Sequence, residues 1–124
     1  MAQELSRLAA RLEEARSGIA ELARSRERVQ AQMTALEQQE AKLGQQATVA
    51  RQFGREDLAH KARTRQQEVQ SQRAELAAQL GQLLDEEAKL TIAAQRLQAR
   101  KARIYRSGLQ AQDEGDPFDA TGRP

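Results

Sequence analysis

The sequence predicts an all-α fold: a long two-helix antiparallel coiled-coil hairpin followed by a disordered C-terminal tail. Three observations predict it: a helix-forming composition, an apolar pattern that repeats every seven residues, and one glycine-centred break near the middle of the chain. The 124 residues include two Phe, one Tyr and no Trp, so the bulky side chains of a compact core are missing. Ala, Leu, Arg, Gln and Glu dominate instead, and these residues favour helices.

The first helix is predicted over residues 3–52, because apolar residues recur there at alternating spacings of three and four. Two rows of a heptad pattern run through this segment, and only Arg26 and Glu40 interrupt them with charge. One row is Leu5, Leu12, Ile19, Arg26, Met33, Glu40 and Ala47, and the other is Leu8, Ala15, Leu22, Val29, Leu36, Leu43 and Ala50. So sustained a repeat is typical of a coiled coil.

The turn is predicted at residues 53–57, where the heptad phase breaks. Gly54 can end a helix in the left-handed conformation that residues with a Cβ atom avoid. Glu56 and Asp57 then suit the positive end of a new helix dipole. A short link between two long, apolar-striped helices makes them antiparallel neighbours.

The second helix is predicted over residues 57–106 and has one firm apolar row. That row is Ala62, Val69, Leu76, Leu83, Leu90, Leu97 and Ile104. The companion row is partly polar, and its register stays open between neighbouring residues. The candidates are Arg65 or Gln66, Gln72 or Arg73, Leu80, Glu86 or Glu87, Ala94 and Lys101.

The two charged residues in the first seam need partners, because burying an unpaired charge is costly. With the turn near residue 54, positions whose numbers sum to about 108 face each other. Arg26 is then expected near residues 79–86 and Glu40 near residues 65–73. Two interpretations stay open: tolerated polar interruptions, or side chains that fix the register between the helices.

The tail, residues 107–124, is predicted to be disordered and acidic. Gly108 onward combines Gly and Pro with four acids, Asp113, Glu114, Asp116 and Asp119, and offers almost nothing to bury. Phe118 stands alone among polar residues, either as a stray aromatic or as a docking anchor.

No pattern in the sequence indicates an enzyme, a metal site or a bound cofactor. The chain has no Cys and one His, and it lacks a phosphate-binding glycine loop and metal-ligand spacing. We interpret His60 as a solvated helix residue. No apolar run is long enough for a membrane span or a signal peptide, so the expected location is cytoplasmic.

Two other groups of residues in the second helix suggest surfaces for partners. A second apolar stripe lies beside the main row, and we expect it to contact a third helix from another copy or another protein: Leu80, Leu84, Ala88 and Ile92. A basic run could touch phosphates of nucleic acid or lipid: Arg96, Arg100, Lys101, Arg103 and Arg106. Cations also suit a helix C-terminus, and no aromatic residues for base stacking accompany them, so nucleic acid is the less favoured partner.

Residues 47–62 resemble the hairpin-turn signature of the phage shock protein A family, which includes the plastid vesicle-inducing proteins. The specific part is the run Gly54, Arg55, Glu56, Asp57, Leu58 and Ala59. The similarity extends from about Leu5 to Ile104, without a counterpart of the family's N-terminal membrane-inserting helix or of its later assembly helices.

The resemblance implies a membrane-stress or envelope-maintenance protein that works through helix-to-helix contact. Its expected partners are a second copy, a full-length family relative or a transcriptional regulator, since the family's hairpin binds and restrains a transcription-activating ATPase. Any membrane association is expected to be peripheral, at the inner face. A different class, a nucleic-acid-binding arm using the basic run, would show a steep loss of affinity with salt.

Overall fold

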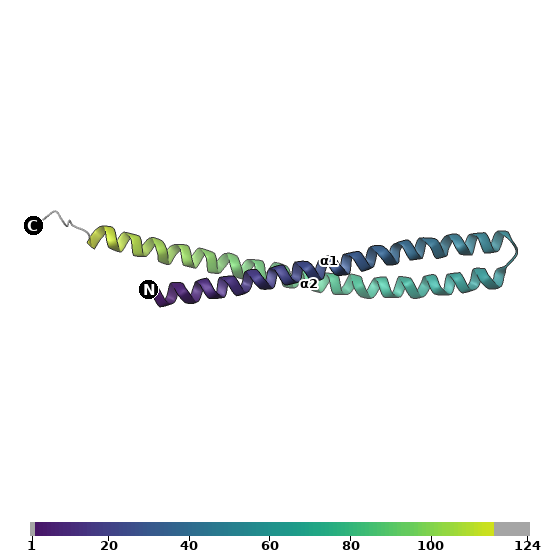
Figure 1. The fold of residues 1–124 in the computed structure, drawn as a ribbon, viewed down its shortest axis with the longest axis horizontal. Helices are drawn as coiled ribbons and strands as arrows, with labels where there is room; N and C mark the ends of the chain where they lie inside the picture. Colours follow the sequence, from purple (N-terminus) through teal and green to yellow (C-terminus); the bar gives the residue numbers. More distant parts are fainter. Residues whose placement is uncertain (1, 116–124) are drawn as a thin grey trace, which may run out of the picture. The chain divides into compact units, whose positions relative to one another are not determined.

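The protein is a two-helix antiparallel coiled-coil hairpin, seen in a computed structural model that describes the backbone of residues 2–115 and the side chains of residues 2–109. Helix α1 spans Ala2–Gln52 and helix α2 spans Glu56–Gly115. Figure 1 shows α1 ending at a short turn, after which α2 runs back beside it. The predicted first helix and turn are confirmed, and the described residues contain no strand.

The second helix continues to Gly115 rather than ending near residue 106. Residues 107–115 are therefore helical, although the sequence pattern assigned them to the tail. Gly108 is the only poor helix former between Ser107 and Gln112, and one glycine costs a helix only ~1 kcal/mol. The disorder predicted for residues 116–124, including Phe118, concerns positions outside the described residues.

The packing of the described residues divides into two compact units. The first unit pairs residues 2–21 of α1 with residues 87–115 of α2. There Arg100 Nη2 lies 3.2 Å from Glu4 Oε1, and Arg16 Nη2 lies 3.4 Å from Gln98 Oε1. The second unit, residues 22–86, contains the turn.

The buried side chains lie where the heptad pattern predicts a seam. In the first unit they are Leu8, Leu12 and Ala15, and in the second they are Val29, Ala47, Ala59 and Val69. All but Ala59 belong to the predicted rows, and Ala59 lies seven residues before the half-buried Gln66. The buried residues are few because two helices cover only one side of each other.

The structure settles the companion row of α2. Gln66, Arg73 and Glu87 are half-buried, whereas their neighbours Arg65, Gln72 and Glu86 are exposed. Leu80, Ala94 and Lys101 are also half-buried, as the pattern predicts. The long side chains in this row can cover the seam with their methylene groups while their polar ends reach partners or water.

Candidate interaction site at the hairpin tip

The turn at the tip is fixed by backbone hydrogen bonds. The amide of Arg55 donates to the carbonyl of Ala50 at 2.8 Å, and the amide of Gly54 donates to the carbonyl of Arg51 at 3.0 Å. With Gly54 at a φ of 72°, this is the Schellman arrangement that satisfies the last carbonyls of a helix. The next residue already opens α2, because the carbonyl of Arg55 accepts a bond from the amide of Ala59.

Charged side chains hold the start of α2 in place. Arg55 donates to both carboxylate oxygens of Asp57, from Nε to Oδ1 at 3.2 Å and from Nη2 to Oδ2 at 3.1 Å. The bond from Arg55, with smaller contributions from backbone amides and Lys61, holds the pKa of Asp57 below its ordinary value. Arg51 Nε lies 3.6 Å from Glu56 Oε1 and links the end of α1 to the start of α2.

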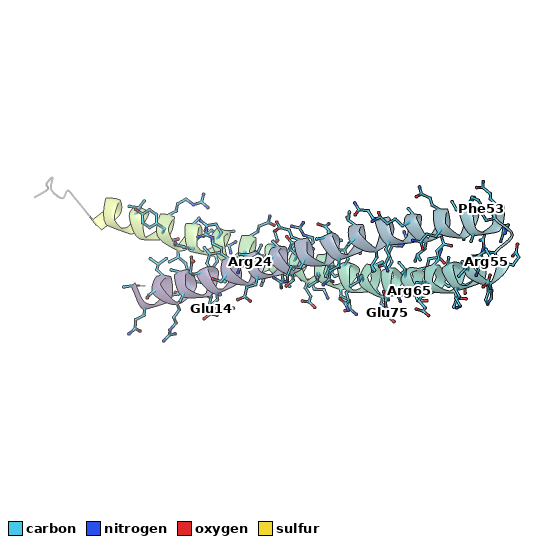
Figure 2. All side chains as sticks on the ribbon, turned by 45° about the vertical axis from the view of Figure 1, so that its right-hand side comes forward. Glu14, Arg24, Phe53, Arg55, Arg65 and Glu75 are labelled. Carbon is cyan, nitrogen blue, oxygen red and sulfur yellow. The ribbon has the colours of Figure 1, made fainter. Side chains whose placement is uncertain are left out.

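Small residues close the seam beneath the tip. Ala47 on α1 and Ala59 on α2 are 0% and 1% exposed, the most buried side chains next to the turn. Because these small side chains fill the seam, the larger apolar side chains near the turn are left at the surface. Figure 2 shows Phe53 and Arg55 at this end of the hairpin.

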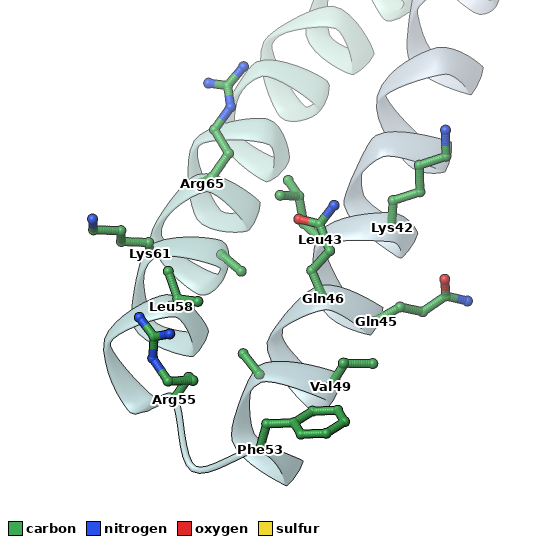
Figure 3. A pocket seen from close by; sticks show the side chains of 12 residues that line it. Lys42, Leu43, Gln45, Gln46, Val49, Phe53, Arg55, Leu58, Lys61 and Arg65 are labelled. Carbon is green, nitrogen blue, oxygen red and sulfur yellow. The ribbon is translucent and has the colours of Figure 1, made fainter.

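An open groove of about 820 Å³ runs along one side of the tip, between the last turns of α1 and the first turns of α2. We call it the tip groove. Its apolar residues are Leu43, Val49, Ala50, Phe53, Leu58 and Ala62, and its polar residues are Lys42, Gln45, Gln46, Arg55, Lys61 and Arg65. Figure 3 shows Val49 on α1, Phe53 just after the end of this helix and Leu58 on the opposite helix.

Three large apolar side chains of the tip groove are exposed to an unusual degree. Phe53 is 77% exposed, Val49 is 50% exposed and Leu58 is 42% exposed. Phe53 directly follows the last residue of α1, and its amide donates to the carbonyl of Val49 at 3.2 Å, which places the two residues on one side of this helix end. Adjacent exposed apolar side chains around a groove are typical of a contact site rather than of ordinary surface.

The rim of the tip groove carries one sign of charge. Four of its twelve lining residues are basic and none is acidic. Arg55 is bound to Asp57, and Arg65 Nη1 lies 2.8 Å from Glu68 Oε2. Figure 3 shows the ammonium groups of Lys42 and Lys61 at opposite edges of the groove. A ligand that combines apolar and acidic groups would complement this surface.

The residues singled out by the turn signature lie at the tip, but only some of them belong to the groove. Arg55 and Leu58 line it, whereas Gly54, Glu56, Asp57 and Ala59 shape or close the turn. Sequence reasoning missed Val49 and Phe53 as surface residues. Their spacing outside both seam rows, directly before the turn glycine, was the signal that could have identified them.

The apolar stripe expected to meet a third helix is partly within the seam. Leu80 is half-buried, as its place in the companion row requires. Ala88 is exposed, and Leu84 and Ile92 are 46% and 48% exposed. These three side chains are therefore exposed in the described part of the chain, outside the seam.

The basic run is divided between the seam and the exposed surface of α2. Lys101 is half-buried in the seam row, while Arg96, Arg103 and Arg106 are exposed. Arg100 is also exposed but is occupied by the carboxylate of Glu4 at 3.2 Å.

Residues 2–115 contain neither a metal-binding cluster nor a membrane-spanning helix. No group of three acidic or histidine side chains in this part of the chain could hold a metal ion, and His60 is exposed. Neither helix, over its described length, has a segment apolar enough to cross a bilayer.

Comparison of the chain with protein-family models, with curated proteins and with solved structures finds no match.

Proposed function

We propose that this chain is a non-enzymatic coiled-coil interaction protein that acts through the tip groove, by self-association or by binding a regulator. The observation that supports this most directly is the exposure of Phe53, Val49 and Leu58 around one groove. Covering such side chains on binding returns roughly 1.5–3 kcal/mol for each one that becomes fully buried. The resemblance of residues 47–62 to the phage shock protein A turn adds the biological role: membrane-stress response or envelope maintenance.

The tip is suited to this role because its backbone is ordered before a partner arrives. The turn is held by the Gly54 and Arg55 amide bonds, and Arg55 is in turn held by Asp57. A preorganised surface loses little conformational freedom on binding. A partner helix could lay an apolar face along the groove, as in other helix-in-groove complexes.

Site-specific photo-cross-linking in cells tests the proposal. A photoreactive amino acid replaces Gln46, which is exposed and lines the tip groove. We expect adducts with a defined protein, identified by mass spectrometry as a regulator, a second copy or a relative of this chain. The captured protein is then purified, and its affinity for the unmodified chain is measured.

Matched variants decide whether the groove is the contact surface. Phe53→Ser should weaken binding of the captured protein by about tenfold or more, because one aromatic anchor is lost. Tyr105→Ser removes an aromatic of similar exposure, 59% against 77%, at the other end of α2 and should leave binding unchanged. Equal effects of the two substitutions, or adducts that form as readily in the Phe53→Ser chain, would contradict the proposal.

A further inference from the structure

The lining of the tip groove favours a ligand of a definite chemical kind. Its apolar side chains need an apolar group to cover them, and its four basic residues, without an acidic residue among the lining, favour negative charge on either side of that group. An aromatic or aliphatic side chain flanked by carboxylates meets both demands. The ion pairs Arg55–Asp57 and Arg65–Glu68 leave Lys42 and Lys61 as the cations at the edges.

The sequence of this chain contains one segment with that chemistry. Residues 113–119 contain Asp113, Glu114, Asp116 and Asp119, and they place Phe118 between the last two acids. The only basic residue after Arg106 is Arg123. Residues 74–88 also combine leucines with four acids and no base, but they are part of helix α2, whose Leu76, Leu80 and Leu83 are half-buried.

We infer that the tip groove of one copy binds the segment 116–119 of a second copy, with Phe118 covering Val49, Phe53 and Leu58. Asp116 and Asp119 would lie toward Lys42 and Lys61, whose charges they complement. This inference rests on the proposed function and names the partner: the chain associates with itself, tip to tail.

The length of α2 favours a second copy over the same copy. Residues 65–115 belong to one α-helix, which rises ~75 Å over fifty residues at ~1.5 Å per residue. Phe118 follows Gly115 by three residues, a reach of at most ~11 Å. The few residues between Gly115 and Phe118 are short against that helix length, so a second copy is the occupant that we infer.

Cysteine cross-linking of the full chain tests this contact. Because the sequence has no cysteine, each introduced thiol is unique. One preparation carries Gln46→Cys on the groove and the other carries Ala120→Cys, two residues after Phe118. The two are mixed and treated with a short bismaleimide, and heterodimers joined between the two thiols are quantified by mass spectrometry.

The expected result is a heterodimer that depends on both sides of the contact. Thr64→Cys, an exposed position of α2 outside the groove, replaces Gln46→Cys as the positional control and should give little product. Adding Phe118→Ser to the Ala120→Cys chain should lower the yield about tenfold at concentrations below the dissociation constant. Raising the ionic strength should lower it further, since exposed charges are screened by salt.

Charge reversal separates a specific contact from general attraction. Lys42→Glu with Lys61→Glu on the groove copy should abolish the cross-link, and Asp116→Lys with Asp119→Lys on the other copy should restore it. Equal yields at positions 46 and 64, or no response to Phe118→Ser, would overturn the inference. A chain carrying both Gln46→Cys and Ala120→Cys that cross-links within one molecule at high dilution would overturn the assignment to a second copy.

The outcomes also separate this inference from the proposed function. If position 46 captures a regulator in a Phe53-dependent way but never joins Ala120→Cys, the tip groove is an interaction site and the self-association is wrong. If position 46 captures nothing that depends on Phe53, the proposed function itself fails.

Discussion

Arg73 on α2 reaches across the seam to Glu40 on α1, with its Nη2 atom 3.1 Å from Oε2. Gln70 donates to the other carboxylate oxygen at 2.9 Å, and Gln66 donates to the backbone carbonyl of Glu40 at 3.2 Å. The Glu40 side chain is only 18% exposed. A charge in the seam is therefore bound by partners from one short stretch of α2, which favours the interpretation that Glu40 helps to fix the register of the two helices.

This arrangement predicts that Glu40 and Arg73 depend on each other. Glu40→Ala should lower the free energy of unfolding by roughly 1–2 kcal/mol, because Arg73 and Gln70 lose their acceptor in a partly buried place. The double variant Glu40→Leu with Arg73→Leu should recover most of this loss, since apolar replacements of both partners are often tolerated. Urea unfolding followed by circular dichroism measures both. Losses that simply add in the double variant would argue against a coupled pair.

The tip is predicted to need the backbone freedom of Gly54. Its φ of 72° strains any residue with a Cβ atom, although no atom lies within 4 Å of where that Cβ would be. Gly54→Val should therefore destabilise the hairpin by about 1–2 kcal/mol or more through the backbone alone. Gly54→Asn should cost less, because Asn accepts the left-handed conformation more readily. Thermal unfolding compares the two, and identical melting temperatures for Gly54→Val and wild type would disprove this account of the turn.

Two helical glycines should respond in opposite ways to the same substitution. Gly81 has open space around its missing Cβ, so Gly81→Ala should stabilise the protein by about 0.5–1 kcal/mol through helix propensity. A Cβ at Gly18 would lie 2.7 Å from Leu90 Cδ2. Gly18→Ala must displace that leucine, so the stability gained from the higher helix propensity of Ala should be cancelled or reversed. Denaturant unfolding of both variants tests the contrast, and equal stabilisation would mean that Leu90 rearranges at no cost.

The ion pair at the start of α2 predicts a specific change in titration. Arg55→Gln should raise the pKa of Asp57 toward its ordinary value, because the hydrogen bond from Arg55 is the largest cause of the lowered pKa. Arg63→Gln, which removes an exposed arginine of the same helix outside this contact, serves as the control. Carboxyl NMR shifts followed against pH measure the change.

The sign of the effect on stability follows from the direction of that shift. A carboxyl group whose pKa is lowered in the folded state stabilises the fold above its unfolded pKa, and this contribution is lost as the pH falls through the folded pKa. Wild type should therefore lose the stability contributed by Asp57 as the pH falls below about 3.8, the ordinary pKa of this carboxyl group. In Arg55→Gln the loss of stability caused by protonating Asp57 should be smaller. An unchanged titration of Asp57 would contradict the role given to Arg55.

The sequence by itself determined the two helices, the position of the turn and most of the seam. Local rules suffice for these features: heptad spacing selects the buried face of each helix, and Gly54 is the residue that can take a positive φ at the break. Because the chain reverses at the turn, residues whose numbers sum to about 108 face each other across the seam. The contacts of Glu40 with Arg73 and Gln66 confirm this pairing.

Only the tertiary structure decided which side chains the pairing of the helices covers and which it leaves in water. The pattern could not choose between Gln66 and Arg65 or between Arg73 and Gln72, because neighbouring polar residues differ in burial only once a facing helix is present. It likewise could not show the tip groove. Val49, Phe53 and Leu58 are ordinary apolar residues in the sequence, and they become a surface because Ala47 and Ala59 close the seam beneath them.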